Sequence, residues 1–293
     1  DTAILKWTIT NGNCASSSAN VTLINYKAAA AANAGPLQQH CENPNFTLAA
    51  NKPNVPGAVG TWTVVYSSYG LTINNSVSHD PNMKVVVPAG DTAILKWTIT
   101  NGTCAATSAN VTLINYKAAA MANAGKMQEH CEDPTFTMAA NQPGVPSAVG
   151  TWTVVSSTFG LTLNAADIHQ HNMQVTIPAG DTAILKWTIT NGTCAATSAN
   201  VTLINYKAAA VANAGQLQEH CNDARFTMTA NAPGVSSAVG TWKDVSRITG
   251  RASIANIHSP VTVVTVPAGD TAILMWTITN GTCQSTSATV TLI

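Results

Sequence analysis

The chain has 293 residues, enough for two or three domains of ordinary size. Its formal net charge is +0 and only 9% of its residues are charged, so the composition gives no electrostatic basis for binding nucleic acid or an anionic membrane. Hydrophobic residues make up 45% and alternate with Thr, Ser and Asn, a pattern that excludes disorder. No run reaches the ~18 apolar residues of a membrane span, so we expect no membrane contact in this segment.

The chain opens on a strand and a hairpin turn, in the segment DTAILKWTITNG. In the copy of this segment that begins at Asp91, one face of the strand is apolar, with Ala93, Leu95, Trp97 and Ile99 in alternate positions. That period of two predicts a half-buried strand. The following Asn101-Gly102 favours a tight turn because both residues tolerate positive φ, and residues 110–114 are the predicted return strand.

Further strands are expected along the chain, separated by Gly, Pro and Asn. The Ala-rich runs at 28–32, 118–120 and 208–210 are each interpreted as the first strand of a domain. In the first domain the strands after it are expected at 46–50, 60–67, 71–74 and 83–87. No segment has a convincing helical period.

The opening segment recurs at Asp91, Asp181 and Asp270, a period of about 90 residues that matches one small β-sandwich. The sequence therefore predicts an all-β fold of tandem seven-stranded immunoglobulin-like (PKD-like) sandwiches. The predicted repeats are 25–114, 115–204 and 205–293. Residues 1–24 are interpreted as the last hairpin of a preceding, truncated repeat.

Several blocks resemble the PKD-like, immunoglobulin-fold repeats of Bacteroidota cell-surface proteins, including gliding-motility adhesins exported by type IX secretion. The blocks are 32–35 (ANAG), Cys41, 60–65 (GTWTVV), 88–90 (PAG) and 97–104 (WTITNGTC), and they recur in the later repeats. The resemblance covers nearly the whole chain. It implies an extracellular or cell-surface location and a structural or adhesive role.

Aromatic and titratable residues give no prediction of chemistry. Core packing is preferred over a sugar-binding platform for the recurring tryptophans, which are Trp62, Trp97, Trp152, Trp187, Trp242 and Trp276. No nucleophile elbow or clustered carboxylates occur, and His169-x-His171 is too isolated to predict a zinc site. We expect no enzyme activity, no catalytic residues, no metal and no cofactor.

Two features mark candidate contact or modification positions. The Asp-Thr-Ala motif resembles the O-glycosylation signal of exported Bacteroidota proteins, with candidate acceptors at Thr2, Thr92, Thr182 and Thr271. An ordinary Asp-Thr turn is the alternative. The copies differ most in 66–87, 156–177 and 246–266, and the last carries extra cations at Arg247 and Arg251, next to Lys243. Such variation marks either a binding face or a tolerant surface.

Seven cysteines at regular places predict a disulfide framework. Bridges inside each repeat would pair Cys41 with Cys104, Cys131 with Cys194 and Cys221 with Cys283, and would leave Cys14 over. However, Cys41 precedes the second strand and Cys104 follows the Asn-Gly turn, at opposite poles of a sandwich. A strand of eight to ten residues spans about 30 Å, whereas a disulfide needs Cα atoms within about 7 Å.

The exit pole of one repeat faces the entry pole of the next, so bridges between repeats are the preferred prediction. They pair Cys41 with Cys194 and Cys131 with Cys283, and leave Cys14, Cys104 and Cys221 unpaired in this fragment.

The leading functional hypothesis is a rigid array of immunoglobulin-like domains in an extracellular adhesin stalk or surface fibre. Its expected partners are the neighbouring repeats, with lateral self-association into fibres, surface glycans and other cells as further candidates. One alternative is a carbohydrate- or protein-binding module that uses the variable segments. Another is a set of accessory domains in a secreted enzyme.

Overall fold

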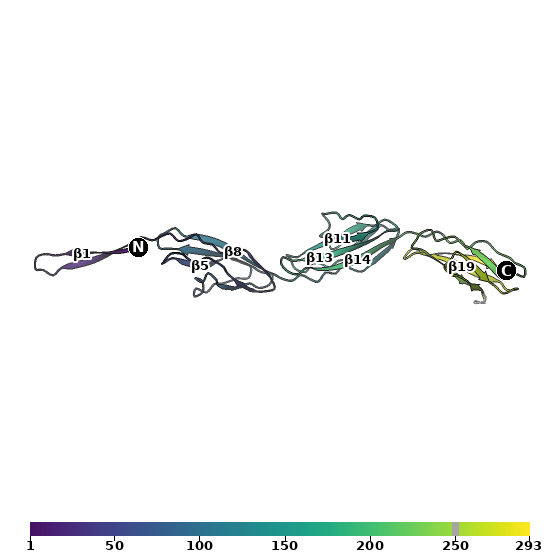
Figure 1. The fold of residues 1–293 in the computed structure, drawn as a ribbon, viewed down its shortest axis with the longest axis horizontal. Coiled ribbons are helices and arrows are strands. Elements are labelled where there is room, and N and C mark those ends of the chain that lie inside the picture. Colours follow the sequence, from purple (N-terminus) through teal and green to yellow (C-terminus); the bar gives the residue numbers. More distant parts are fainter. Residues whose placement is uncertain (248–251) are drawn as a thin grey trace. The chain divides into compact units, whose positions relative to one another are not determined.

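A computed structural model describes residues 1–247 and 252–293, and every regular element within them is a β-strand (Figure 1). Among these residues no helix is long and apolar enough to cross a membrane. The chain divides into two compact units. The first comprises Asp1–Ala120, Gly144–Ala148 and Thr190–Ala196, and the second comprises Met121–Pro143, Val149–Ile189 and Thr197–Ile293.

The first unit begins with an antiparallel hairpin and continues into a two-sheet domain. The hairpin pairs β1 (Thr2–Ile9) with β2 (Ser17–Ile24). The larger sheet of the domain has the order β3-β8-β7-β5 and the smaller sheet pairs β4 with β6. Their bounds are β3 (Gln38–Cys41), β4 (Asn45–Thr47), β5 (Val59–Ser67), β6 (Lys84–Val86), β7 (Thr92–Thr100) and β8 (Thr107–Tyr116).

The second unit holds two further two-sheet domains, of which the first repeats this topology and the second has three strands in each sheet. Its first copy has the sheets β11-β13-β14-β9 and β10-β12, built from β9 (Gln128–Cys131), β10 (Thr135–Thr137), β11 (Val149–Ser157), β12 (Gln174–Thr176), β13 (Thr182–Thr190) and β14 (Thr197–Tyr206). Its second copy has the sheets β16-β19-β20 and β15-β18-β17, built from β15 (Arg225–Thr229), β16 (Val239–Asp244), β17 (Ser253–Ile254), β18 (Val261–Thr265), β19 (Ala272–Thr279) and β20 (Thr286–Leu292).

Each core lies between two sheets and centres on a tryptophan pair. In the first unit, Trp62 on β5 stands opposite Trp97 on β7, with ring centroids 5.0 Å apart. Both rings are buried, and their N–H groups donate to the backbone oxygens of Asp80 and Asn51. Gly60 must lack a side chain, because a Cβ there would lie 2.0 Å from the Trp97 ring. The Trp152–Trp187 and Trp242–Trp276 pairs repeat this arrangement. The prediction of an all-β, immunoglobulin-like sandwich is therefore confirmed.

The hairpin of β1 and β2 has the sequence of a core hairpin and an uncovered apolar face. Trp7 is 72% exposed, whereas Trp97 at the equivalent place in β7 is 0% exposed. Leu5, Ile9, Val21 and Leu23 share the exposure of Trp7. The two strands of this hairpin therefore pair although their apolar face is exposed. The equivalent face in the complete domains is buried because a second sheet packs against it.

Two expected strands are absent from the described ladders. The Ala-rich run at 28–32 forms no strand. Two of its amides donate to side-chain oxygens, Ala30 to Asn54 and Ala32 to Thr107. The runs at 118–120 and 208–210 likewise lie outside strands. The first ladder strand is instead β3, which pairs in parallel with β8. Residues 71–74 also form no ladder. Each copy thus has six regular strands among the described residues, and the Ala-rich segment is not one of them.

Candidate functional site

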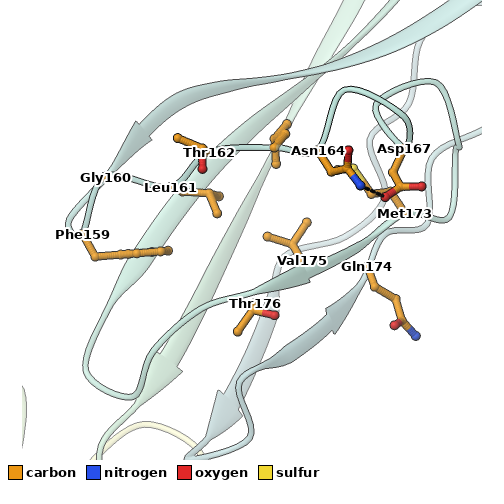
Figure 2. A pocket seen from close by; sticks show the side chains of 11 residues that line it. Phe159, Gly160, Leu161, Thr162, Asn164, Asp167, Met173, Gln174, Val175 and Thr176 are labelled. Carbon is orange, nitrogen blue, oxygen red and sulfur yellow. Dashed lines mark hydrogen bonds between the residues drawn. The ribbon is translucent and has the colours of Figure 1, made fainter.

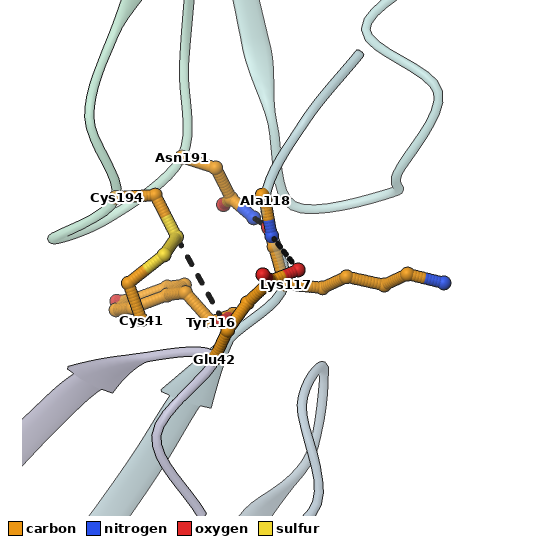
Figure 3. The surroundings of a disulfide bond; sticks show 7 residues. All are labelled: Cys41, Glu42, Tyr116, Lys117, Ala118, Asn191 and Cys194. Atoms are coloured by element: carbon orange, nitrogen blue, oxygen red, sulfur yellow. Dashed lines mark hydrogen bonds between the residues drawn. A yellow bond between two sulfur atoms is a disulfide. The ribbon is translucent and has the colours of Figure 1, made fainter.

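The candidate site of the first unit is a joint at the place where the chain leaves β8. We call this contact the first joint: residues 116–118 packed against 41–42 and 191–194 (Figure 3). Cys41 is the last residue of β3 and Glu42 follows it, and residues 191–194 lie in the turn between β13 and β14. All of these residues belong to the first unit. Sequence-distant segments therefore meet at one point on the backbone of Tyr116.

A disulfide closes the first joint. The structure bonds Cys41 to Cys194 across 153 residues of sequence, with Cα atoms 5.0 Å apart. The Cys194 sulfur also lies 3.8 Å from the backbone oxygen of Tyr116. This is the pairing that the argument from the poles of a sandwich predicts. Cys104, the partner required by the alternative, is a free thiol.

The ring of Tyr116 fills the space over Gly192. Gly192 has a φ of 50° and belongs to the Asn-Gly turn, and a Cβ on it would lie 2.2 Å from the Tyr116 ring. Two constraints therefore select glycine here: the left-handed backbone and the close approach of an aromatic ring. The turn is shaped both to reverse the chain and to receive Tyr116.

Backbone groups of the first joint are paired by side chains. The amide nitrogen Nδ2 of Asn191 donates to the Lys117 oxygen at 2.7 Å. Glu42 has a φ of 54°, unusual for a residue with a side chain. In that conformation its N–H donates to the Tyr116 oxygen and its carboxylate accepts the Ala118 N–H at 3.2 Å. The exit of β8 is thus fixed from both sides, by the disulfide segment and by the turn (Figure 3).

The second unit contains an equivalent second joint: residues 206–208 against 131–132 and 280–283. Cys131 is bonded to Cys283 with Cα atoms 5.0 Å apart, and a Cβ on Gly281 would meet the Tyr206 ring at 2.1 Å. Asn280 donates to the Lys207 oxygen at 2.7 Å. Tyr206 differs from Tyr116 in donating its hydroxyl to Glu129 at 3.1 Å. Burial, and then this hydrogen bond and the Glu129 charge, raise the pKa of Tyr206.

The chain near residue 26 shows the same contacts without a disulfide. A Cβ on Gly102 would meet the Tyr26 ring at 2.3 Å, and Asn101 donates to the Lys27 oxygen at 2.8 Å. Cys104, beside this turn, is free, as are Cys14 and Cys221. The three buried turn asparagines, Asn101, Asn191 and Asn280, keep an Oδ1 with no hydrogen-bond partner in the described part of the chain.

These joint residues escaped prediction from the sequence, apart from the cysteines. The available signal was that Asn-Gly and Tyr-Lys recur unchanged in every copy. A hairpin explains Asn-Gly by itself, so nothing in one copy links it to a tyrosine. The contact becomes visible only when the turn is placed beside the end of a strand from elsewhere in the chain.

The remaining candidate positions are scattered. Thr92 and Thr182 are half-buried at strand starts and their amides donate to Ser68 and Thr158, while Thr2 and Thr271 are exposed. Within the described residues no group of three or more His, Cys, Asp or Glu could hold a metal. His169 contacts the Gly150 oxygen at 2.9 Å, as His79 and His258 contact their equivalents. Lys243 and Arg247 are exposed, and Arg251 lies outside the described residues.

A hollow of about 340 Å³ lies in the variable segment of the second unit, between residues 159–167 and 173–176 (Figure 2). Phe159 lies at one side, and Asn164 donates to Asp167 at 2.9 Å at the other. The first unit has Tyr69 at the place of Phe159, and its hydroxyl donates to the Val86 oxygen at 2.7 Å. Burial, and secondarily the Asp91 charge, raise the pKa of Tyr69. The two copies therefore present different surfaces here.

No family model matches the chain, and no curated protein matches it either. Among solved structures it is similar to the Dpr2 Ig1-Ig2 complex with DIP-Theta Ig1-Ig3, with a TM-score of 0.45 and 11% identity over 90% of this chain and 99% of that one. For Sidekick-1 immunoglobulin domains 1–5 the TM-score is 0.43 and the identity 13%, over 91% of this chain and 59% of that one. For the titin I9-I11 tandem the TM-score is 0.34 and the identity 15%, over 92% of this chain and 99% of that one.

Proposed function

We propose that this chain is a structural segment of an extracellular stalk or surface fibre, in which the repeats 25–114, 115–204 and 205–293 form a stiff array. The observation that carries the proposal is the joint. A disulfide, an aromatic ring on a glycine and an Asn-to-backbone hydrogen bond act at the same place in both joints. A chain selected for independent domains would not need any of them.

The segments after the joints support stiffness. Residues 117–127 and 207–217 contain no Ser and one Gly each, so they lack the composition of a flexible linker. Their amides are held by side chains of the adjacent strand: Ala122 donates to Thr197 at 2.9 Å and Ala212 to Thr286 at 2.9 Å. Each segment after a joint is therefore anchored along the next sheet.

An extracellular location is proposed on the disulfides. Such bonds persist in oxidising compartments and are rare in the cytosol. A cell-surface setting of the Bacteroidota type agrees with this, and the exposed Thr2 and Thr271 are then the best-placed acceptors for O-glycosylation. The proposed role is structural rather than catalytic, with neighbouring repeats as the first partners and lateral association or surface glycans as further ones.

Two experiments test this function. Gold-labelled antibodies against the chain should decorate filaments or stalks outside cells of the native host, and labelling confined to the cytoplasm would contradict the proposal. Small-angle X-ray scattering of the oxidised protein should give one maximum dimension that does not change with ionic strength. A broad distribution of dimensions that resembles that of the reduced protein would contradict stiffness.

The hollow beside Phe159 favours a second candidate function, a binding module for glycans or proteins. It lies in the variable segment, combines an aromatic ring with the Asn164 and Asp167 side chains, and differs from its counterpart at Tyr69. Glycan arrays probed with the chain and with Asp167→Ala would test it. A ligand lost only in that variant would support a binding role, and no ligand on any array would leave the fibre as the function.

A further inference from the structure

The two disulfides are interlocked in sequence order. Cys131 lies inside the loop closed by Cys41 and Cys194, and Cys194 lies inside the loop closed by Cys131 and Cys283. Three stretches of chain therefore connect the same two cross-links: 41–131, 131–194 and 194–283. The shortest has about 63 peptide steps, and it limits how far the cross-links can separate even when every strand has melted.

We propose that this interlocked pair is a strain-limiting covalent path, which carries tension past the folded sheets and caps the extension of the array. This rests on the proposed fibre function, because only a chain under tension uses such a path. A disulfide inside one repeat would shorten only that repeat. In the interlocked pair, the two bonds close overlapping stretches of chain. If one bond breaks, the other still keeps most of that chain length from extending.

The maximum extension of the cross-linked chain can be calculated from the residue numbers of the cysteines. With both bonds intact, the shortest covalent route between the termini limits the extension. It runs from 1 to 41, 131 to 194 and 283 to 293, which is 40, 63 and 10 steps and about 113 together. At ~3.3–3.6 Å per residue this is about 400 Å. The fully reduced chain has about 292 steps and reaches about 1,000 Å.

Losing one bond has a small effect and losing the second a large one. Without the first bond the route is 1 to 131 and then 283 to 293, about 140 steps, a gain of only about 27. Breaking the remaining bond then adds about 152 steps. In distance these are about 95 Å and about 530 Å. A small gain in length for the first bond and a large gain for the second are expected when both bonds close the same stretch of chain.

A continued array would tighten the path further. Cys104 lies in a turn equivalent to that of Cys194, and Cys221 follows the same parallel bridge position as Cys41. If both were bonded to further repeats, the path would run from Cys104 to Cys131 along β8, the Ala-rich segment and β9, about 27 steps. The residues of β8 and β9 on this path are already near full extension, so they have little slack to release.

Single-molecule force spectroscopy on the full 293-residue chain, held at both termini, tests the proposal. The variant Cys41→Ala with Cys194→Ala should reach about 95 Å further than the oxidised parent at complete unfolding. Bonds inside each repeat predict that it reaches about 440 Å further, because two loops of about 63 steps would open. Either that value or no gain would overturn the proposal.

Two further arms complete the design. Cys104→Ala with Cys221→Ala, the matched control, should leave the maximum extension of the oxidised chain unchanged, and a gain would overturn the interlocked pairing. Adding reductant to the Cys41→Ala, Cys194→Ala chain should then release about 530 Å. These lengths depend only on which cysteines are bonded, so the path can fail this test while antibody labelling still finds the chain in surface fibres.

Discussion

Substituting Gly192 by Ala tests whether the Tyr116 ring holds the first joint. A Cβ at Gly192 would lie 2.2 Å from that ring, so the ring or the turn must move. Gly12 is a matched control, since it follows Asn11 in the equivalent turn, has a φ of 54° against 50°, and has nothing within 4 Å of its added Cβ. Both substitutions place Ala in the left-handed region at about 1–2 kcal/mol. Only Gly192→Ala adds the overlap.

The overlap between the added Cβ and the Tyr116 ring determines how much Gly192→Ala destabilises the joint. Overpacking of this kind costs about 1–3 kcal/mol, and it is relieved when Tyr116 leaves the turn. The open state of the joint should therefore gain about 5- to 150-fold in population, at tenfold per 1.4 kcal/mol. Since the disulfide between Cys41 and Cys194 lies in this joint, its reduction by an added dithiol should accelerate by about the same factor.

The assay is quenched alkylation after timed reduction, followed by mass spectrometry of the cysteine peptides. The bond between Cys131 and Cys283 serves as an internal reference, because it belongs to the second joint. We expect Gly192→Ala to speed reduction of the first bond only, Gly281→Ala of the second only, and Gly12→Ala of neither. Equal rates for Gly192→Ala and Gly12→Ala would refute the idea that the ring contact stabilises the joint.

Three other outcomes are expected. Thiol titration of the unfolded, unreduced protein should find three free thiols, Cys14, Cys104 and Cys221, whereas bridges within each repeat would leave one. Gly60→Ala should lower the thermal stability of the first repeat by about 3 kcal/mol or more, because its Cβ would lie 2.0 Å from Trp97, and Gly70→Ala, with open space around it, should show only the cost of its positive φ. Because the pKa of Tyr206 is raised by burial and then by Glu129, the stability it adds is present below pH ~10 and is lost as the pH rises through its folded pKa. Glu129→Gln should lower that pKa in an ultraviolet titration referenced to Tyr206→Phe, and an unchanged titration would contradict the assigned contact.

The long antiparallel hairpin of each repeat could be predicted from local sequence alone. Alternation in 93–99 and the Asn-Gly turn give the observed register, in which Trp97 pairs with Ala109. The preferred pairing of the cysteines is a prediction argued from the poles of a sandwich, and the poles follow from strand order. The hairpin depends on period and turn chemistry, both of which are local.

The first strand could not be predicted, because its position depends on a distant partner. The run at 28–32 has apolar residues without alternation, and its amides are satisfied by the Asn54 and Thr107 side chains. The true first strand, Gln38–Cys41, is polar and pairs in parallel with the end of β8. Its His40 stacks on Phe46 at 4.0 Å between centroids. Neither contact leaves a periodic trace in the sequence.

The buried asparagines of the Asn-Gly turns also bear on chemical ageing. An exposed Asn-Gly pair is prone to lose ammonia when the glycine nitrogen attacks the asparagine side chain, a reaction that needs a mobile turn. Asn191 is 2% exposed and its amide nitrogen is held by the Lys117 oxygen, so this attack is hindered. Asn11 has the same neighbour but is exposed. A chain kept for months should therefore accumulate aspartate and isoaspartate at Asn11 first, while Asn191 remains an amide for as long as Tyr116 covers its turn.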